Sequence, residues 1–302
     1  MNLKSIIKLA QLYSTTASVF PFLLGLLYSW YHYQKFQLVP SIVLFIAVVL
    51  FHAAVNIRDE YLDYKVASEK NAPHAEEMTV GQDKLDLDSV KKVYNIVGLI
   101  SALLGIYLVF QTGIALLYIG LVCYLIGVLY TSGPHPISST PYGEAFSGVA
   151  MGFAIYFVAV FVNAFGTMTL DVPTTSKIFL ASVPTIMVVI NIMLANNICD
   201  LEEDIEDNRF TLPYYTGKSK ALVLFKAFYA VAYISLIVSV FIGVYPKMVL
   251  LALLAIPLTK KNTSKFMAVQ EKSQTFIYAV QNSAIIPVFI IITFVIGIVL
   301  NF

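Results

Sequence analysis

Charged residues are scarce in this chain. Only 12% of its 302 residues are Asp, Glu, Lys or Arg, whereas about 25% is usual for a soluble domain. The 19 basic and 18 acidic residues nearly cancel to a net charge of +1. There is therefore no excess of positive charge to bind nucleic acid, and the composition points away from a water-soluble fold.

Cysteine is also nearly absent. Cys123 lies in an apolar run and Cys199 lies in a polar motif, so these residues predict neither a disulfide framework nor a cysteine metal site. The apolar stretch near the N-terminus lacks the short core and the small-residue cleavage site of a signal peptide. We therefore interpret it as the first membrane span.

Hydrophobic residues make up 59% of the chain and occur in runs of about 20, enough to cross about 30 Å of hydrocarbon as a helix. This pattern predicts an all-α membrane protein of about nine transmembrane helices, with residues 1–302 forming a single domain. The eighth span is bracketed by Pro246 and Pro257 and crosses only if its helix continues past one of them. The predicted spans are 9–31, 39–63, 90–111, 113–130, 142–165, 177–200, 220–244, 247–258 and 275–300.

With nine crossings, nearly all charge falls on one side of the membrane. Of the 19 basic residues, all except Lys35, Lys177 and Lys247 lie on the side of the N-terminus. The positive-inside rule makes that side cytoplasmic. Every acidic residue except Asp171 lies there too. Because acidic residues contribute little to topology, this second bias indicates that the cytoplasmic face uses carboxylates.

One polar pattern, N-I-x-D-x-x-x-D, ends both the second and the sixth predicted span. Its Asn and two Asp positions are spaced to share one face of a helix. Like charges one turn apart repel, so we expect a cation between them. Hard oxygen ligands suit Mg²⁺, which fills its other positions with water and substrate phosphates. The residues are Asn56, Asp59 and Asp63 in the first motif and Asn197, Asp200 and Asp204 in the second.

A single motif of this kind is also expected where a helix simply leaves the membrane into water. Two copies with the same spacing favour a metal site. They also predict a direct repeat, in which helices one to four and five to eight are related units in the same orientation and the ninth is added. Basic residues that can offset the charge of a diphosphate follow the motifs: Lys65, Lys70, Arg209, Lys218 and Lys220.

The pair of motifs resembles the UbiA superfamily of intramembrane prenyltransferases. The second run, N-N-I-C-D-L-E-E-D-I-E-D-N-R-F-T-L over residues 196–212, is most similar to the 1,4-dihydroxy-2-naphthoate prenyltransferases of menaquinone synthesis. There N-N-x-R-D-x-x-x-D-x-x-x-G-K-x-T-L is typical. Further agreement comes from D-Y-K at 63–65, Tyr130-Thr131 and Tyr142-Gly143-Glu144. The resemblance covers essentially the whole chain.

The chain departs from that subgroup at three places. Cys199 replaces the usual Arg, Asn208 replaces the usual Gly, and the stretch after the first motif contains no arginine. Asn tolerates the left-handed conformation that a tight turn there requires, and Arg209 matches the basic position. The missing arginines leave the phosphate clamp and the substrate preference open.

The resemblance implies Mg²⁺-dependent transfer of a polyprenyl group from its diphosphate to an aromatic acceptor, at the cytoplasmic face of the plasma membrane. If the acceptor is the naphthoate, the product is demethylmenaquinone. The implied catalytic metal ligands are Asp59, Asp63, Asp200 and Asp204, with Asn56 and Asn197 completing the coordination. The implied substrate-binding residues are Asn56, Lys65, Asn196, Asn197, Arg209 and Lys218.

Polar residues inside the spans have more than one interpretation. His52 lies one turn before Asn56 and either lines the acceptor pocket or is a histidine satisfied within the membrane. Asn163, Asn191 and Asn282 are better explained by hydrogen bonds between helices.

Two groups of alternatives stay open for the function. Within the family they are prenyl transfer to 4-hydroxybenzoate and haem O synthesis. From another class the alternative is an ion-coupled transporter. Transporters usually carry their acidic residues near the bilayer midplane, on broken helices in inverted repeats, whereas these aspartates lie at helix ends.

Overall fold

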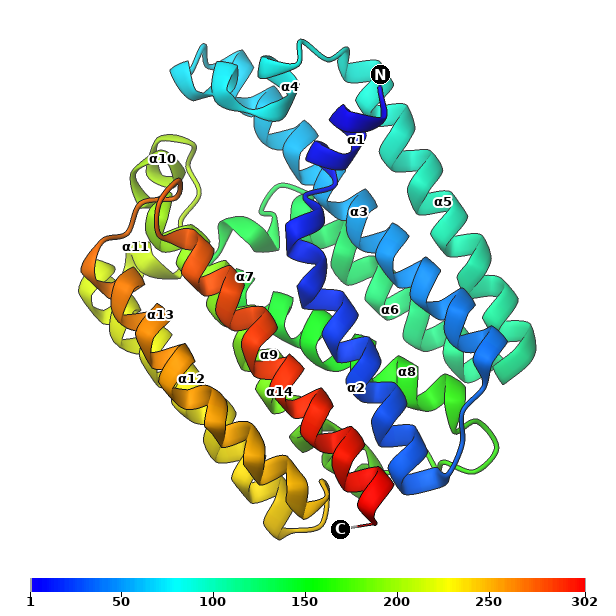
Figure 1. The fold of residues 1–302 in the computed structure, drawn as a ribbon. Coiled ribbons are helices and arrows are strands. Elements are labelled where there is room, and N and C mark those ends of the chain that lie inside the picture. The colour runs from blue at the N-terminus through cyan, green and yellow to red at the C-terminus, as the bar shows by residue number, and fades with distance from the viewer. Residues whose placement is uncertain (1, 302) are drawn as a thin grey trace. The chain divides into compact units, whose positions relative to one another are not determined.

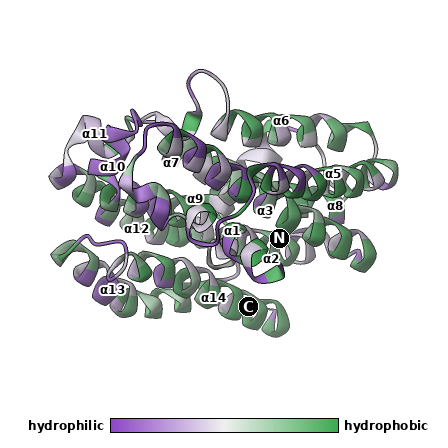
Figure 2. Ribbon diagram, turned by 90° about the horizontal axis from the view of Figure 1, so that it is seen from above, coloured by the Kyte–Doolittle hydropathy of each residue, from purple (hydrophilic) through white to green (hydrophobic). Residues whose placement is uncertain are grey.

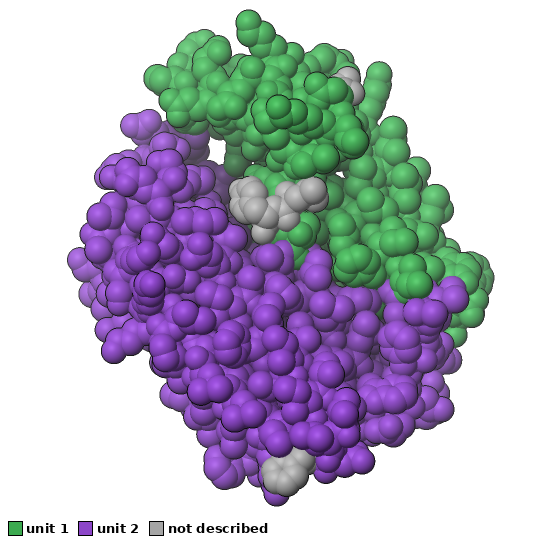
Figure 3. Space-filling model, in the orientation of Figure 1, with its two compact units in different colours: residues 1–15, 42–137 green, residues 16–41, 138–302 purple. Residues whose placement is uncertain are grey.

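The structure is a computed structural model that describes residues 2–301, without the side chains of residues 12 and 13. Throughout this range the regular elements are helices and there is no strand (Figure 1). The predicted all-α fold is therefore confirmed. The chain divides into two compact units (Figure 3): unit 1 is Met1–Thr15 with Ile42–Ile137, and unit 2 is Thr16–Ser41 with Ser138–Phe302.

Seven helical segments in the described part of the chain are long and apolar enough to cross a membrane. They correspond to predicted spans two to seven and nine, so the chain is a multi-pass membrane protein. The count of nine is not confirmed, because the first and eighth predicted spans are not among them. The seven are α3 (Leu38–Glu69), α5 (Leu87–Thr112), α6 (Ile114–Thr131), Gly143–Asn163, α9 (Val172–Cys199), α12 (Lys218–Phe241) and α14 (Phe276–Leu300).

The first predicted span is interrupted near its start. The chain forms α1 (Leu3–Leu9), a 3₁₀ turn η1 (Leu12–Thr15) and α2 (Thr16–Tyr33). Gln11, between α1 and η1, has a left-handed φ of 47°, which a regular helix does not contain. The last turns of α2 carry Tyr, Ser, Trp and His, so its apolar stretch is shorter than the predicted one.

The eighth predicted span is helical, but it begins as a 3₁₀ helix and continues as an α-helix. The 3₁₀ helix η5 (Lys247–Ala255) leads directly into α13 (Ile256–Ala268). Pro257 lies in the first turn of α13, where its missing N–H removes no helical hydrogen bond. The helix therefore continues past Pro257, but α13 then contains Lys260, Lys261 and Lys265.

In unit 2, α9 is the central helix. It packs against α12 and α14, while α2 packs against α8 (Ile155–Asn163) and α14 (Figure 1). In its apolar stretch 72% of the residues are buried, against 44% or less in the other six candidate spans. Because α9 ends at the second motif, that motif emerges from the most tightly packed part of unit 2.

The fifth predicted span is built from three helical pieces within unit 2. The short helix α7 (Gly143–Ser147) passes into a π-helical turn η4 (Gly148–Ala154) and then into α8. After α9, the chain forms α10 (Leu201–Glu206) and α11 (Leu212–Thr216). Hydrophilic residues gather at α10 and α11, whereas α12 is mostly hydrophobic (Figure 2).

In unit 1, α3 packs with α5 and α6. The rings of Phe51 and Tyr124 stack with centroids 4.4 Å apart, and the Ser101 hydroxyl donates to the Ala47 carbonyl at 2.8 Å. Between α3 and α5 the chain forms a 3₁₀ turn η2 (Pro73–Glu77) and a short helix α4 (Thr79–Gln82). The compact units do not coincide with the predicted repeat, since α2 packs within unit 2.

Candidate active site

The first motif lies on an uninterrupted helix. The helix α3 runs from Leu38 to Glu69, so Asn56, Asp59 and Asp63 share one face as predicted. All three side chains are half-buried. This face belongs to unit 1.

The Asn56 carboxamide is anchored to the N-terminal segment of unit 1. Its Nδ2 donates to the Ala10 carbonyl and to Ser14 Oγ, both at 2.9 Å. The same Ser14 Oγ lies 3.1 Å from Nε2 of His52, which is buried. This geometry supports the interpretation of His52 as a histidine satisfied within the membrane.

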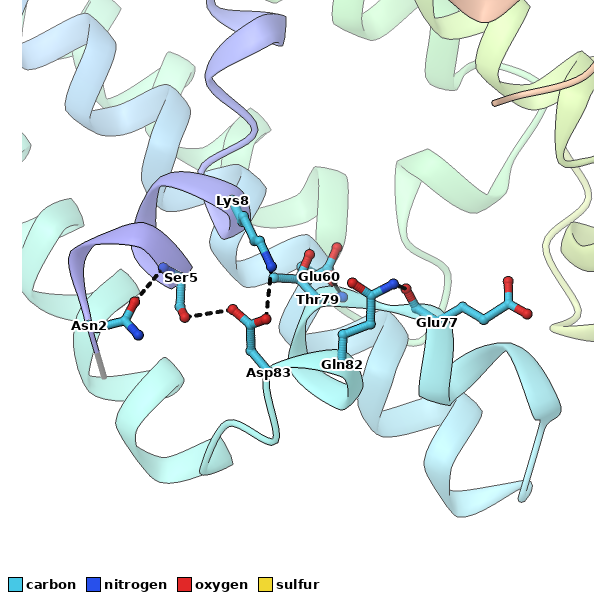
Figure 4. Close-up of polar contacts among 8 residues, drawn as sticks. All are labelled: Asn2, Ser5, Lys8, Glu60, Glu77, Thr79, Gln82 and Asp83. Atoms are coloured by element: carbon cyan, nitrogen blue, oxygen red, sulfur yellow. Dashed lines mark hydrogen bonds and ion pairs between the residues drawn. The ribbon is translucent and has the colours of Figure 1, made fainter. Parts of the chain in front are cut away.

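The connection after the first motif is held by contacts that the sequence analysis did not identify (Figure 4). The Glu60 carboxylate accepts the backbone N–H of Thr79 at 2.6 Å, at the start of α4. Asp83, just after α4, accepts from Ser5 Oγ at 2.6 Å and from Lys8 Nζ at 2.8 Å. The Lys8 ammonium, followed by the Ser5 hydroxyl, lowers the pKa of Asp83.

A small apolar cluster supports these polar contacts. Its buried residues are Leu9, Ala10, Ile57, Val80 and Val90. They come from α1 and the residue after it, α3, α4 and α5. The cluster thus fixes α1 and α4 next to the part of α3 that carries the first motif.

The second motif does not lie on one uninterrupted helix, which differs from the continuous helix that its spacing predicts. The helix α9 ends at Cys199, Asp200 has φ −93° and ψ 9°, and α10 begins at Leu201. The break falls where the chain leaves the core, since Ile198 is buried while Glu202 is exposed. The Asp204 N–H still donates to the Asp200 carbonyl at 2.8 Å, so the two aspartates remain one turn apart.

Asp200 is held by one neighbour in sequence and one distant residue. Asn196 Nδ2 donates to its Oδ2 at 3.0 Å, and Lys272 Nζ forms an ion pair with the same oxygen. Lys272 lies between α13 and α14, 72 residues further along the chain. The predicted residue Asn196 therefore contacts the motif, and Lys272 is an addition that the sequence analysis did not identify.

Asp204 is buried and paired with a residue predicted to bind substrate. Arg209 Nε lies 3.2 Å from its Oδ1 in an ion pair, and Thr211 Oγ1 donates to its Oδ2 at 3.2 Å. The Arg209 N–H also donates to the Asp204 carbonyl at 2.7 Å. Between them, Asn208 has a left-handed φ of 59°, as the sequence predicts for the position where Gly is usual.

The Asn197 side chain is buried and points its amide nitrogen at a carboxylate. Its Nδ2 donates to Glu144 Oε1 at 2.8 Å. Glu144 lies on α7, 53 residues earlier in the chain. In both motifs, therefore, the asparagine NH₂ group donates to protein atoms.

The remaining predicted lysines lie at the surface of their units. Lys65 is exposed on α3, with Nζ 4.0 Å from Glu69 Oε1. Lys218 is exposed at the first residue of α12.

The asparagines inside the spans bond between helices, as predicted. Asn163 Oδ1 accepts from Ser41 Oγ at 2.9 Å, and Asn191 Nδ2 donates to the Phe225 carbonyl at 3.0 Å. Asn282 Oδ1 accepts from Asn262 Nδ2 at 3.0 Å. These residues therefore stabilise the packing of unit 2.

The donor atoms of each motif fit Mg²⁺. Each motif offers two carboxylates and one carboxamide, and Mg²⁺ commonly takes one or two carboxylates and leaves its other positions to water and substrate phosphates. Within residues 2–301, omitting the side chains of 12 and 13, no three His, Cys, Asp or Glu side chains form a metal-binding group. Asp200 and Asp204 already attract the cations of Lys272 and Arg209.

Comparison with known proteins identifies relatives along most of the chain. The profile of the UbiA prenyltransferase family matches residues 18–279. The 1,4-dihydroxy-2-naphthoate octaprenyltransferase of Bacillus subtilis (strain 168) is 31% identical over 289 residues, which cover 92% of this chain and 86% of that protein.

Solved structures share the fold at lower identity. The apo structure of a UbiA homologue from Aeropyrum pernix K1 matches with a TM-score of 0.73 and 16% identity, over 92% of this chain and 98% of that one. A UbiA homologue from Archaeoglobus fulgidus bound to GPP and Mg²⁺ matches with a TM-score of 0.69 and 11% identity, over 97% and 99%. Because the family profile and the Bacillus relative agree over most of its length, this protein belongs to the UbiA prenyltransferase family and is an enzyme of that class.

Proposed function

We propose that this enzyme transfers a polyprenyl group from a polyprenyl diphosphate to 1,4-dihydroxy-2-naphthoate in a Mg²⁺-dependent reaction. The observation that carries the proposal is the 31% identity to the Bacillus naphthoate octaprenyltransferase over 92% of the chain. The residues 196–212, which resemble that subgroup, add to it. Membership of a prenyltransferase family leaves the transporter alternative without support.

The two motifs supply the residues for binding the diphosphate. Bound Mg²⁺ supplies a Lewis acid that offsets the negative charge growing on the leaving diphosphate. The residues that would hold it are Asp59, Asp63, Asp200 and Asp204, with the carboxamide oxygens of Asn56 and Asn197. We propose Lys65, Asn196, Arg209 and Lys218 as residues that bind the diphosphate, and Lys272 joins them because it lies at Asp200.

The reaction breaks the allylic C–O bond, and its electron pair leaves with the diphosphate. An electron-rich ring carbon of the acceptor then forms the new C–C bond. The naphthoate carboxylate departs as CO₂, which gives demethylmenaquinol, the reduced form of demethylmenaquinone. Water competes for the electrophilic carbon, so a site enclosed by apolar helices protects the reaction.

We also propose that one transmembrane domain carries the reaction at the cytoplasmic face of the plasma membrane. The basis is the charge distribution, since all basic residues except Lys35, Lys177 and Lys247 fall on one side in the nine-span topology. Single cysteines at Lys70 and Lys218, in a chain without Cys123 and Cys199, are expected to react with a membrane-impermeant thiol reagent in inverted vesicles only. Labelling in intact cells contradicts this topology.

Complementation tests the acceptor. The gene is expected to restore menaquinone in a bacterium that lacks its own dihydroxynaphthoate prenyltransferase. Parallel strains lacking the 4-hydroxybenzoate prenyltransferase or haem O synthase serve as controls, and we expect no rescue there. Rescue of one of those strains alone shows that the acceptor is wrong, while family membership stands.

A further inference from the structure

Glu144 is a buried carboxylate next to the second motif that the proposed reaction does not use. It lies on α7 with 2% of its surface exposed. Its Oε1 accepts the hydrogen bond from Asn197 Nδ2 at 2.8 Å. The backbone N–H groups of Glu144 itself and of Leu212 also interact with its carboxyl group. Burying a carboxyl group away from water is costly, so a role for Glu144 is expected.

The hydrogen bond between Asn197 and Glu144 fixes which end of the Asn197 carboxamide faces the carboxylate. A carboxamide has one end that donates hydrogen bonds and one that accepts them. Since the NH₂ end of Asn197 donates to Glu144, its oxygen points away from that carboxylate. The oxygen is the end that can bind Mg²⁺, because hard cations take oxygen ligands.

We propose that Glu144 is a positioning residue, which holds the Asn197 carboxamide with its oxygen available to the metal–diphosphate site. This inference rests on the proposed function, since it needs Asn197 to act as an oxygen ligand. Partners behind a metal ligand commonly fix its orientation, and their loss typically weakens metal binding about 10- to 100-fold.

Close packing of the fifth span against α9 supports this role. A Cβ atom added at Gly152 of η4 would lie 2.5 Å from Cα of Ile186, and one added at Gly148 would lie 2.5 Å from Cγ1 of Ile190. Both contacts are shorter than real Cβ atoms tolerate, so only glycine permits this approach of η4 to α9. Glu144 and Asn197 extend the same contact by one or two turns, which fixes their separation.

The asparagine of the first motif also directs its NH₂ group at protein acceptors, but these acceptors are different. Asn56 also donates its NH₂ group to protein atoms, the Ala10 carbonyl and Ser14 Oγ. In unit 1 neutral acceptors therefore orient the carboxamide, whereas in unit 2 a buried carboxylate does so. The shared orientation in two different surroundings is what equivalent oxygen ligands require.

Metal binding in the whole protein tests the proposal without turnover. The probe is Mn²⁺ with inorganic diphosphate, followed by electron paramagnetic resonance. We expect Glu144→Ala to weaken Mn²⁺ binding by about tenfold or more. Glu144→Gln retains an oxygen that accepts the Asn197 hydrogen bond, so it is expected to bind within about threefold of the wild type, well short of that loss.

A double-mutant cycle and a neighbouring control separate positioning from damage to the fold. If Glu144 acts through Asn197, adding Glu144→Ala to Asn197→Ala produces no further loss of Mn²⁺ affinity. Ser147→Ala removes another buried polar group of α7 and is expected to leave Mn²⁺ affinity unchanged. Thermal unfolding of each variant shows whether it is folded.

The outcomes separate a failure of the proposed role of Glu144 from a failure of the proposed metal site. Wild-type Mn²⁺ affinity in folded Glu144→Ala, together with a clear loss in Asn197→Ala, overturns the role of Glu144 and leaves the metal site standing. An equal loss from Glu144→Ala in the wild-type and Asn197→Ala backgrounds also overturns it. If Asp200→Asn and Asp204→Asn bind Mn²⁺ as the wild type does, the proposed metal site itself fails.

Discussion

The two motifs have the same sequence pattern but different surroundings. The first lies on an unbroken helix, and its asparagine is tied to the N-terminal segment by neutral hydrogen bonds. The second lies across a helix break at Asp200, and its residues contact Lys272, Arg209 and Glu144. Sequence spacing therefore identifies the candidate ligands, while the packing of distant segments determines how each ligand is held.

The largest expected effect comes from the four aspartates. Replacing Asp59, Asp63, Asp200 or Asp204 by Asn preserves size but removes a charged metal ligand. We expect prenyl transfer to fall by about 100-fold or more, where each tenfold corresponds to about 1.4 kcal/mol of transition-state stabilisation. The measurement is kcat/KM of purified variants at saturating Mg²⁺.

Glutamates beside each motif provide matched controls. Glu202 is exposed on α10, so Glu202→Gln is expected to retain activity near the wild type. Glu60 accepts the Thr79 N–H, and Glu60→Gln keeps an oxygen for that bond. Similar activity in all six variants removes the support for a metal site at the motifs.

The second-largest expected effect is a loss of stability when the buried ion pair of the second motif is broken. Side chains of Arg209 and Asp204 are only 18% and 9% exposed. Removing one partner of a buried pair leaves an uncompensated charge, which typically costs about 3–5 kcal/mol. We therefore expect Arg209→Ala to lower the thermal unfolding temperature clearly, and Arg209→Ala with Asp204→Asn to recover part of it. No change in Tm for Arg209→Ala shows that the pair does not stabilise unit 2.

A smaller effect is expected at Lys272, because its ion pair is more exposed. The Lys272 side chain is 54% exposed, and exposed pairs contribute about 0–1 kcal/mol. Stability of Lys272→Met is thus expected to match the wild type. The Lys272 ammonium pairs with a carboxylate oxygen of Asp200 and so competes there with Mg²⁺. Removing the ammonium is therefore expected to lower the Mg²⁺ concentration needed for half-maximal activity. A higher KM for prenyl diphosphate at unchanged Mg²⁺ requirement instead indicates that Lys272 acts only on the diphosphate.

The smallest expected effect concerns the contacts of α1 in unit 1. The pKa of Asp83 is lowered in the folded protein, first by the Lys8 ammonium and then by Ser5. Its contribution to stability is therefore complete above the unfolded pKa of about 3.9 and is lost as pH falls through the folded value. The protection factors of the α1 amides, which compare measured exchange with the intrinsic rate at each pH, are expected to stay constant between about pH 8 and pH 5. Asp83→Asn is expected to lower these protection factors at neutral pH; unchanged protection contradicts the anchoring role.

Features that depend on local sequence were predicted well. Apolar length and composition identify seven helices that can cross a membrane, because a span must satisfy its backbone internally. The left-handed turn at Asn208 follows from the residue type and its place in the motif. The continuous face of Asn56, Asp59 and Asp63 follows from helical spacing on α3.

Features that depend on distant residues were not predictable from one sequence. Lys272 reaches Asp200 across 72 residues, and Glu144 reaches Asn197 across 53. No spacing rule links such positions, because the packing of helices brings them together. The break at Asp200 was also missed, since the motif has the same spacing as the unbroken first copy and contains neither Gly nor Pro there.

Prenyl transfer by the purified protein tests whether the reaction at the two motifs depends on a metal ion. Purified wild-type protein is incubated with radiolabelled polyprenyl diphosphate and 1,4-dihydroxy-2-naphthoate, with Mg²⁺ or with EDTA. We expect a labelled prenyl naphthoquinol and release of CO₂ with Mg²⁺, and neither product with EDTA or with Asp204→Asn. Equal product formation with Mg²⁺, with EDTA and with Asp204→Asn contradicts a metal-dependent reaction at these motifs.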